Sequence, residues 1–195
     1  GTTGSAGDAI ALQQGYVELV APLKFWDSNE ILPHSVKVMA GRFVTLAGAE
    51  VIEGPDNWNV SRSILFGFAI PFTHTGVRTN FKIFKDFFEV FMGINNGWDN
   101  VLDTNTFKTM EFGWNFSPIK NVKVIQSIYF GPENANQSGH KRFLLDNVVI
   151  WNATDKLTFM ANADWGTEHR VPRIGEIHDG SDAPDDNDLS FHNSP

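Results

Sequence analysis

The feature that most constrains this chain is a strict two-residue alternation of apolar and polar side chains. In GVRTNFKI, residues 76–83, the odd-numbered positions from Val77 onward are apolar or Thr, and the even-numbered positions from Arg78 onward are polar or charged. The alternation returns in TMEFGWNF, residues 109–116, with the apolar side chains at even-numbered positions. Because successive side chains of a β-strand point to opposite faces, the pattern predicts strands with one apolar and one polar face.

Similar segments recur along the chain, and we count eight predicted strands. Short turns near Lys85, Ser117 and Asn152 alternate with long polar loops that begin near residues 95, 131 and 166. Short turns at one end and long loops at the other are typical of transmembrane barrels. We therefore predict an all-β fold, an antiparallel transmembrane-type β-barrel or a large fragment of one, since eight strands alone close only a narrow, side-chain-filled barrel.

The predicted domain organisation is a single β-barrel domain over residues 1–170, followed by an acidic loop or flexible tail over 171–195. The order of turns and loops makes residues 45–74 a long inward loop, and its length suggests a function beyond connection. Within it, the segment from Asn59 to Ser63 and the following ILFGFAI predict a short helix capped by Asn59, or alternatively a strand.

Composition excludes several classes of function. The net charge is -8 and no cluster of Lys and Arg offsets it, so nucleic acid is not an expected partner. There is no cysteine, and no run of about 18 apolar residues predicts a transmembrane helix. The sequence lacks a GxSxG elbow, a P-loop and a GxGxxG motif, so we predict neither an enzyme nor a cofactor.

No metal site is predicted. The six histidines are scattered without an HxH or HxxxH pair, at His34, His74, His140, His169, His178 and His192. The aspartates from Asp179 to Asp188 offer oxygen ligands but lack the spacing and final Glu of a calcium-binding EF-hand loop. A solvated acidic tail and a calcium site both stay open for that segment.

Charged side chains of both signs surround the long loop or lie on the polar strand faces. The candidates for a pore lining or constriction are Arg42, Glu50, Glu53, Arg62, His74, Arg78, Glu89 and Glu111. Facing charges at a constriction set a field that selects solutes, whereas on a soluble protein the same residues are ordinary surface ion pairs. Glu18, Glu89 and Glu111 also allow a glycoside hydrolase as an alternative, although nothing fixes the separation of a carboxylate pair.

Tryptophans lie near predicted strand ends. The candidates for an aromatic girdle at the lipid–water boundary are Trp98, Trp114, Trp151 and Trp165. The same rings suit sugar-stacking platforms, so a soluble β-sandwich that binds or hydrolyses polysaccharide is the main alternative.

Several ordered segments resemble one known family. The stretch GRFVTLAGAEVIEGPDNWNVSRSILFGFAIPFTHTGVR, residues 41–78, is similar to the signature region of the OmpL-like β-barrel porins of Gram-negative bacteria, and the similarity continues through INNGWDNVLDTNTFKT, YFGPE and KRFLLD. Gly97, Trp98 and Asp99 form a second family-like motif. Because this chain ends SFHNSP rather than on a terminal aromatic, we expect a partial or shortened member.

The resemblance implies an outer-membrane porin that transports small polar or charged solutes and ions by passive diffusion. The expected partners are outer-membrane lipid and small solutes, with room for a homo-oligomer, and the expected location is the outer membrane of a Gram-negative bacterium. These expectations and the polysaccharide-binding alternative differ in what the apolar faces touch: lipid in the first, a second packed sheet in the second.

Overall fold

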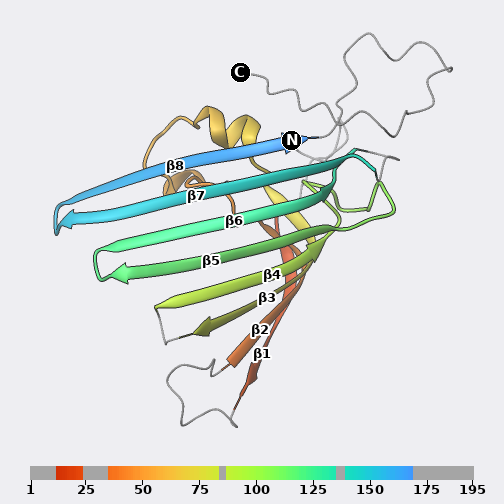
Figure 1. Ribbon diagram of the computed structural model, residues 1–195, viewed down its shortest axis with the longest axis horizontal. Helices are drawn as coiled ribbons and strands as arrows, with labels where there is room; N and C mark the ends of the chain where they lie inside the picture. The colour runs from red at the N-terminus through yellow and green to blue at the C-terminus, as the bar shows by residue number, and fades with distance from the viewer. Residues whose placement is uncertain (1–11, 24–34, 84–86, 135–138, 169–195) are drawn as a thin grey trace.

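A computed structural model describes residues 12–23, 35–83, 87–134 and 139–168 of the chain, and these residues form mainly β-strands (Figure 1). The strands are β1 (Gly15–Pro22), β2 (Ser35–Val44), β3 (Thr73–Ile83), β4 (Phe88–Asn95), β5 (Thr109–Ile119), β6 (Val122–Pro132), β7 (Lys141–Thr154) and β8 (Leu157–Glu168). The predictions for the tail 171–195, for Asp179 to Asp188 and for His34, His169, His178 and His192 lie outside the described residues.

All eight strands belong to one sheet, in the order in which they occur along the chain. Each strand pairs antiparallel with the next, and β1 and β8 are the two edges, so the sheet is open over the described ranges. Figure 1 shows β1 to β3 turned away from the plane of β5 to β8. The predicted all-β antiparallel class is confirmed, in an open form that fits a large fragment of a barrel. The described strands do not form the two packed sheets of a β-sandwich.

Two connections at one end of the sheet are short, and two at the other end are long. Lys120–Asn121 join β5 to β6, and Asp155–Lys156 join β7 to β8. Residues 45–72 join β2 to β3, and residues 96–108 join β4 to β5 at the opposite end. We call these the turn end and the loop end. The loop predicted from residue 131 starts later, because β6 continues to Pro132.

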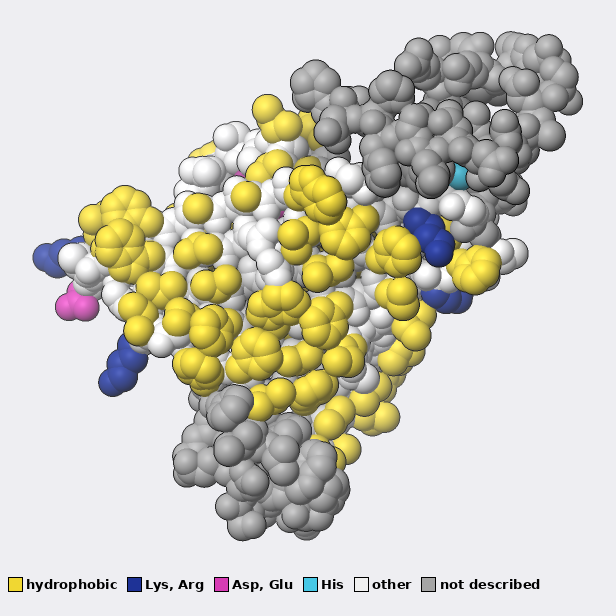
Figure 2. Space-filling model, in the orientation of Figure 1, with side chains coloured by type: hydrophobic (Ala, Val, Ile, Leu, Met, Phe, Trp, Pro, Cys, Tyr) yellow, Lys and Arg dark blue, Asp and Glu magenta, His cyan; other side chains and the backbone are white. Residues whose placement is uncertain are grey.

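The register separates two faces of the sheet. Arg78, Glu111 and Tyr129 lie in one transverse row, which passes through Gly93. We call their side the inner face, because residues 45–72 pack against it, and the opposite side the outer face. Exposed apolar side chains of the outer face are Val17, Leu19, Val77, Met92, Ile94, Met110, Phe112, Val149, Trp151, Phe159 and Trp165. Hydrophobic side chains accordingly cover much of the surface over the strands in Figure 2.

Two glycines allow neighbouring strands to approach closely where the sheet curves. Gly41 of β2 lies directly opposite Gly76 of β3. A Cβ atom on Gly41 would lie 2.4 Å from the carbonyl oxygen of Gly15, and one on Gly76 would lie 2.2 Å from that of Ile94. Any larger residue therefore collides with the adjacent strand, and Gly41 also has a φ of +134°. Glycine at such positions is typical of tight bends at barrel corners.

The long connection 45–72 contains two short helical turns, Gly54–Asp56 and the π-helical Leu65–Ala69. The predicted cap at Asn59 is wrong, because the second turn begins after Ile64 and Asn59 lies several residues before it. The Ser63 hydroxyl accepts a hydrogen bond from the Phe66 amide at 3.1 Å instead. None of the described helices is long and apolar enough to cross a membrane.

Candidate functional site

The centre of the covered inner face is a buried ion pair. Arg78 Nε donates to Glu111 Oε1 at 2.5 Å, and its Nη2 donates to Glu111 Oε2 at 2.8 Å. The two side chains come from β3 and β5 and are 7% and 0% exposed. The Arg78 guanidinium also lies 4.2 Å from the centroid of the Phe43 ring. A bidentate ion pair this deeply buried links β3 to β5 and has a structural role, because each charge compensates the other.

Beside this pair, Tyr129 and His74 hold the start of the loop. The Tyr129 hydroxyl accepts a hydrogen bond from the Leu46 amide at 2.9 Å and lies 3.0 Å from Thr45 Oγ1. The His74 ring stacks on Tyr129 with centroids 4.7 Å apart, and its Nε2 lies 3.3 Å from the same Thr45 hydroxyl. Ala47 then packs in a small apolar core with Tyr129. The first residues of the loop are therefore fixed to the inner face.

The Gly97-Trp98-Asp99 motif fixes the other end of the loop. Asp99 has a φ of 58° and accepts hydrogen bonds from the Thr73 amide at 2.9 Å and the Phe72 amide at 3.1 Å. Aspartate tolerates this left-handed conformation better than most residues. Gly97 has a φ of +104°, which only glycine adopts without strain. The motif thus joins the loop 96–108 to the end of the loop 45–72.

Trp98 does not lie on the outer face, so its predicted place in an aromatic girdle is wrong. Its ring packs against the apolar core under the loop and lies 4.5 Å from the Arg142 guanidinium. Its amide donates to Glu133 Oε2 at 2.7 Å, and the Thr109 hydroxyl donates to Glu133 Oε1 at 2.6 Å. Burial raises the pKa of Glu133, although these two donors oppose the rise. Trp98 is therefore part of the loop end.

A third anchor, absent from the sequence-based candidates, lies on β7 and β8. The Ala49 amide donates to Asn162 Oδ1 at 3.2 Å, and Asn162 Nδ2 donates to Asp146 Oδ1 at 2.7 Å. Asp146 is fully buried and lies opposite Asp164 in the register. Asp164 Oδ2 is buried without a hydrogen-bond partner among the described residues. The signal in the sequence is an aspartate at inner-face positions of two adjacent strands, and only the register shows that they meet.

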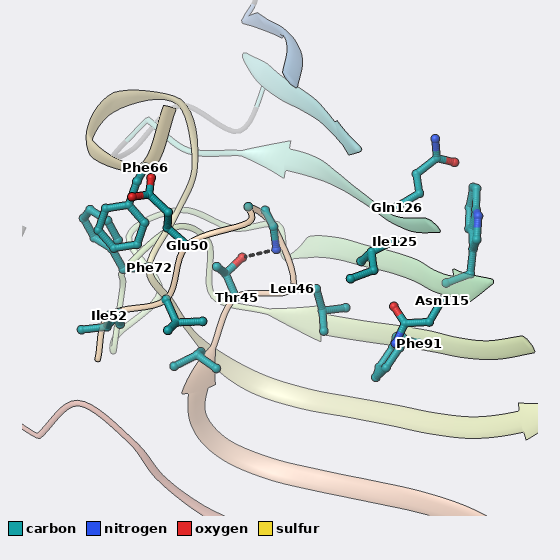
Figure 3. A pocket seen from close by; sticks show the side chains of 15 residues that line it. Thr45, Leu46, Glu50, Ile52, Phe66, Phe72, Phe91, Asn115, Ile125 and Gln126 are labelled. Carbon is teal, nitrogen blue, oxygen red and sulfur yellow. Dashed lines mark hydrogen bonds between the residues drawn. The ribbon is translucent and has the colours of Figure 1, made fainter. Parts of the chain in front are cut away.

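An apolar cavity of about 220 Å³ separates part of the loop from the sheet. Figure 3 shows Phe66 and Phe72 of the loop at one side, and Phe91, Asn115 and Ile125 of the strands at the other. The loop is thus fixed at its base and at its end, while its middle stands away from β4 to β6.

The eight predicted pore-lining residues do not form one ring. His74, Arg78 and Glu111 lie buried beneath the loop. Glu50 and Arg62 shape the loop itself: the Glu50 carboxylate accepts from the Ser63 amide at 3.0 Å, and Arg62 Nη2 donates to the Ile52 carbonyl at 2.7 Å.

The other three candidates lie apart. Glu89 is on the uncovered inner face, where Asn80 and Asn115 donate to its two oxygens at 2.9 and 2.8 Å. Arg42 is on an outer-face position and donates to Thr73 Oγ1 at 3.1 Å. Glu53 is exposed on the loop and accepts from Gln13 at 2.8 Å. Of the eight, Glu89 is the carboxylate on the open wall.

The other three girdle candidates do lie on outer-face positions. Trp114 is near the middle of β5 and packs edge-on against Phe112. Trp151 stacks on Phe159 near the turn end, and Trp165 packs edge-on against Phe143 near the loop end. No group of three or more His, Asp or Glu side chains that could hold a metal ion occurs within the described ranges.

A single antiparallel sheet with an apolar outer face, a polar inner face and a long connection folded onto the inner face defines the wall of a membrane-type β-barrel. The chain belongs to the family described as "Putative beta-barrel porin-2, OmpL-like", whose family model matches residues 3–187. No curated protein and no solved structure matches the chain.

Proposed function

We propose that this chain forms the wall of an outer-membrane porin in a Gram-negative bacterium, through which small polar or charged solutes diffuse passively. The observation that carries the proposal is the loop 45–72, which is fixed to the inner face at Tyr129 and at Asn162 and to the loop 96–108 at Asp99, while the outer face is largely apolar. A loop held inside a barrel narrows its lumen, and the narrowest point sets the size of the solute that passes. This mechanism requires no chemical step.

The spacing of the outer aromatic side chains supports contact with lipid. Phe159, which stacks on Trp151, and Trp165 lie six residues apart on β8. At roughly 3.4 Å per residue this separation is about 20 Å along the strand. Transmembrane barrels carry an apolar band about 25 Å tall between two aromatic girdles. At a strand tilt of about 35–45° the two positions are about 15 Å apart across such a band, so Trp151 and Trp165 lie toward its opposite sides.

The distribution of charge on the inner face supports a division of roles. Arg78 and Glu111 compensate each other beneath the loop, so they contribute little field to the lumen. Glu89 and the pair of Lys37 and Glu18, with Nζ and Oε2 3.2 Å apart, lie on the uncovered part of the wall. In this proposal the uncovered charges meet the solute, and Glu50 and Arg62 shape the loop that faces it.

Conductance in planar lipid bilayers tests the proposal. We expect the purified chain to require detergent, to shift on a gel after heating as folded barrels do, and to produce discrete conductance steps after insertion. The heat-unfolded chain in the same detergent is the control. Swelling of liposomes in sugars of increasing size then measures the limit set by the loop. A chain that stays folded and monodisperse without detergent, or one that inserts without conducting, contradicts the proposal.

A further inference from the structure

Two side-chain amides interrupt the apolar outer face near its midpoint. Gln126 of β6 and Asn147 of β7 lie directly opposite each other in the register. Around them the outer-face positions of these strands are apolar, at Val122, Val124, Ile128, Phe130, Phe143, Leu145, Val149 and Trp151, whereas Lys141 lies at the loop-end start of β7. Figure 2 shows non-hydrophobic surface among the hydrophobic side chains over this part of the sheet. The amides therefore stand where the proposed function places the middle of the membrane.

The two amides satisfy each other only in part. Gln126 Nε2 donates to Asn147 Oδ1 in a short hydrogen bond. Each amide offers two N–H donors and one carbonyl oxygen, so this bond leaves one Gln126 N–H unused, and it engages neither the Gln126 oxygen nor the Asn147 Nδ2 atom. Neither atom has a hydrogen bond to another of the described residues; Asn162 contacts only the backbone carbonyl of Asn147, at 3.1 Å. In hydrocarbon, where no water can replace a missing partner, such groups cost several kcal/mol each.

The surface around the amides is shaped to admit a partner. Next to Asn147, β8 presents the exposed small residues Ala163 and Ala161. Larger aromatic pairs stand on both sides along the strands: Trp151 with Phe159, and Phe143 with Trp165. Small residues let two backbones approach closely in a membrane, and polar side chains then bond across the contact.

We propose that a second copy of this chain docks on this surface about a two-fold axis through the amide pair. In that arrangement the Gln126 carbonyl of each copy accepts a hydrogen bond from the partner's Asn147. A two-fold contact places the same patch on both sides, so a patch that carries both a spare acceptor and spare donors is complementary to itself. Lipid chains offer neither group. The inference rests on the proposed function, because the amides cost free energy only if the outer face meets lipid.

The first experiment measures the mass of the folded protein in detergent and counts the subunits in lipid bilayers by stepwise photobleaching. We expect the wild-type chain to be a dimer. Gln126→Leu combined with Asn147→Leu removes both amides at similar volume, and we expect it to weaken dimerisation at least about tenfold, a factor that corresponds to about 1.4 kcal/mol. Met92→Leu with Met110→Leu is the matched control on the outer face of β4 and β5, and it should stay dimeric.

A second experiment uses the absence of cysteine from the chain. Ala163→Cys places a thiol beside the amides, and Val77→Cys places one on the distant outer face of β3. A short bismaleimide should link two copies of the first variant and not of the second.

A wild-type chain that conducts and is heat-modifiable but remains monomeric overturns the dimer and leaves the porin proposal standing. A Leu double variant that stays dimeric also overturns it. Failure of the porin proposal is recognised separately, as a chain that folds without detergent.

Discussion

The covered and uncovered parts of the inner face derive from the same alternating pattern and have opposite environments. Under the loop, Arg78 and Glu111 are 7% and 0% exposed. On β1 and β2, outside the area that the loop covers, Lys37 and Glu18 form a pair whose side chains are 43% and 33% exposed. A charge on the polar face of a strand is therefore not by itself a charge in the lumen. What covers the strand decides whether the charge holds the structure together or meets the solute.

The two parts also differ in how much a substitution should cost. An exposed ion pair contributes about 0–1 kcal/mol, because water already solvates both partners. Removing one partner of a buried pair costs about 3–5 kcal/mol, because the other charge remains without compensation. The comparison therefore predicts large structural effects beneath the loop and small structural but measurable electrical effects on the open wall.

The largest expected effect is that of Glu111→Ala. It leaves the Arg78 guanidinium buried without its carboxylate, so we expect a loss of about 3–5 kcal/mol in the free energy of unfolding. Urea titration of the chain in lipid vesicles measures this loss. We also expect noisier bilayer currents, since the loop is then held by fewer contacts.

The matched control for this substitution replaces the whole pair. Arg78→Met with Glu111→Leu removes both charges at similar volume, and such replacements of buried pairs are often close to neutral. A double variant as unstable as Glu111→Ala would show that the covered part depends on more than compensated charge.

A smaller effect is expected from Tyr129→Phe. It removes the hydroxyl that accepts from the Leu46 amide and contacts Thr45, while the ring stacked on His74 stays. A buried amide without a partner costs about 1–3 kcal/mol, and we expect faster tryptic cleavage after Arg62 of the loop. Tyr16→Phe is the control, because Tyr16 is the only other tyrosine in the chain and is 46% exposed. Equal cleavage rates in the two variants would remove Tyr129 from the anchor.

Alternation predicted the strands, their faces and the arrangement of turns and loops, because the two-residue period of a strand depends only on local geometry. It correctly placed Arg78 and Glu111 on one face. It could not predict that they touch, since that requires the register of three strands and a glycine, Gly93, between them. Pairing across such a gap is a tertiary property.

The contacts that hold the loop 45–72 in place were equally beyond the sequence pattern. Trp98 stands in a polar loop, and its motif gave no sign that the ring would turn inward onto Arg142. The fold of the loop depends on single acceptors such as Asp99 and Asn162, whose partners are backbone amides. Backbone amides are identical along the sequence, so a pattern of side chains cannot show which of them a carboxylate or amide will bind.

On the uncovered part of the inner face, Glu89→Gln should change ion selectivity more than the free energy of unfolding. Asn80 and Asn115 both donate to Glu89 on a partly exposed face, so we expect a change in unfolding free energy within about 0.5 kcal/mol. Loss of one negative charge from the lumen should shift the reversal potential in a salt gradient toward anion permeation. Glu53→Gln, on an exposed part of the loop, is the control. A Glu89→Gln variant with unchanged reversal potential places this carboxylate outside the conducting path.

The smallest expected effect belongs to the ion pair of Asp103 and Lys108, 2.5 Å apart in the loop 96–108. Burial alone would raise the pKa of Asp103, but the hydrogen bonds from Lys108 and the Asn105 amide, with the charge of Lys108, lower it. The folded-state pKa of Asp103 lies below the unfolded-state value near 4, so the pair stabilises the fold fully above that value. This stabilisation is lost as the pH falls through the folded-state pKa. Because the Lys108 ammonium is exposed to water on a surface loop, we expect Asp103→Asn to cost no more than about 0.5 kcal/mol at neutral pH. Unfolding titrations should show this difference in unfolding free energy between the wild-type chain and Asp103→Asn vanish in acid.

A difference as large as that of Glu111→Ala would mean that the two kinds of ion pair are not distinguished by burial.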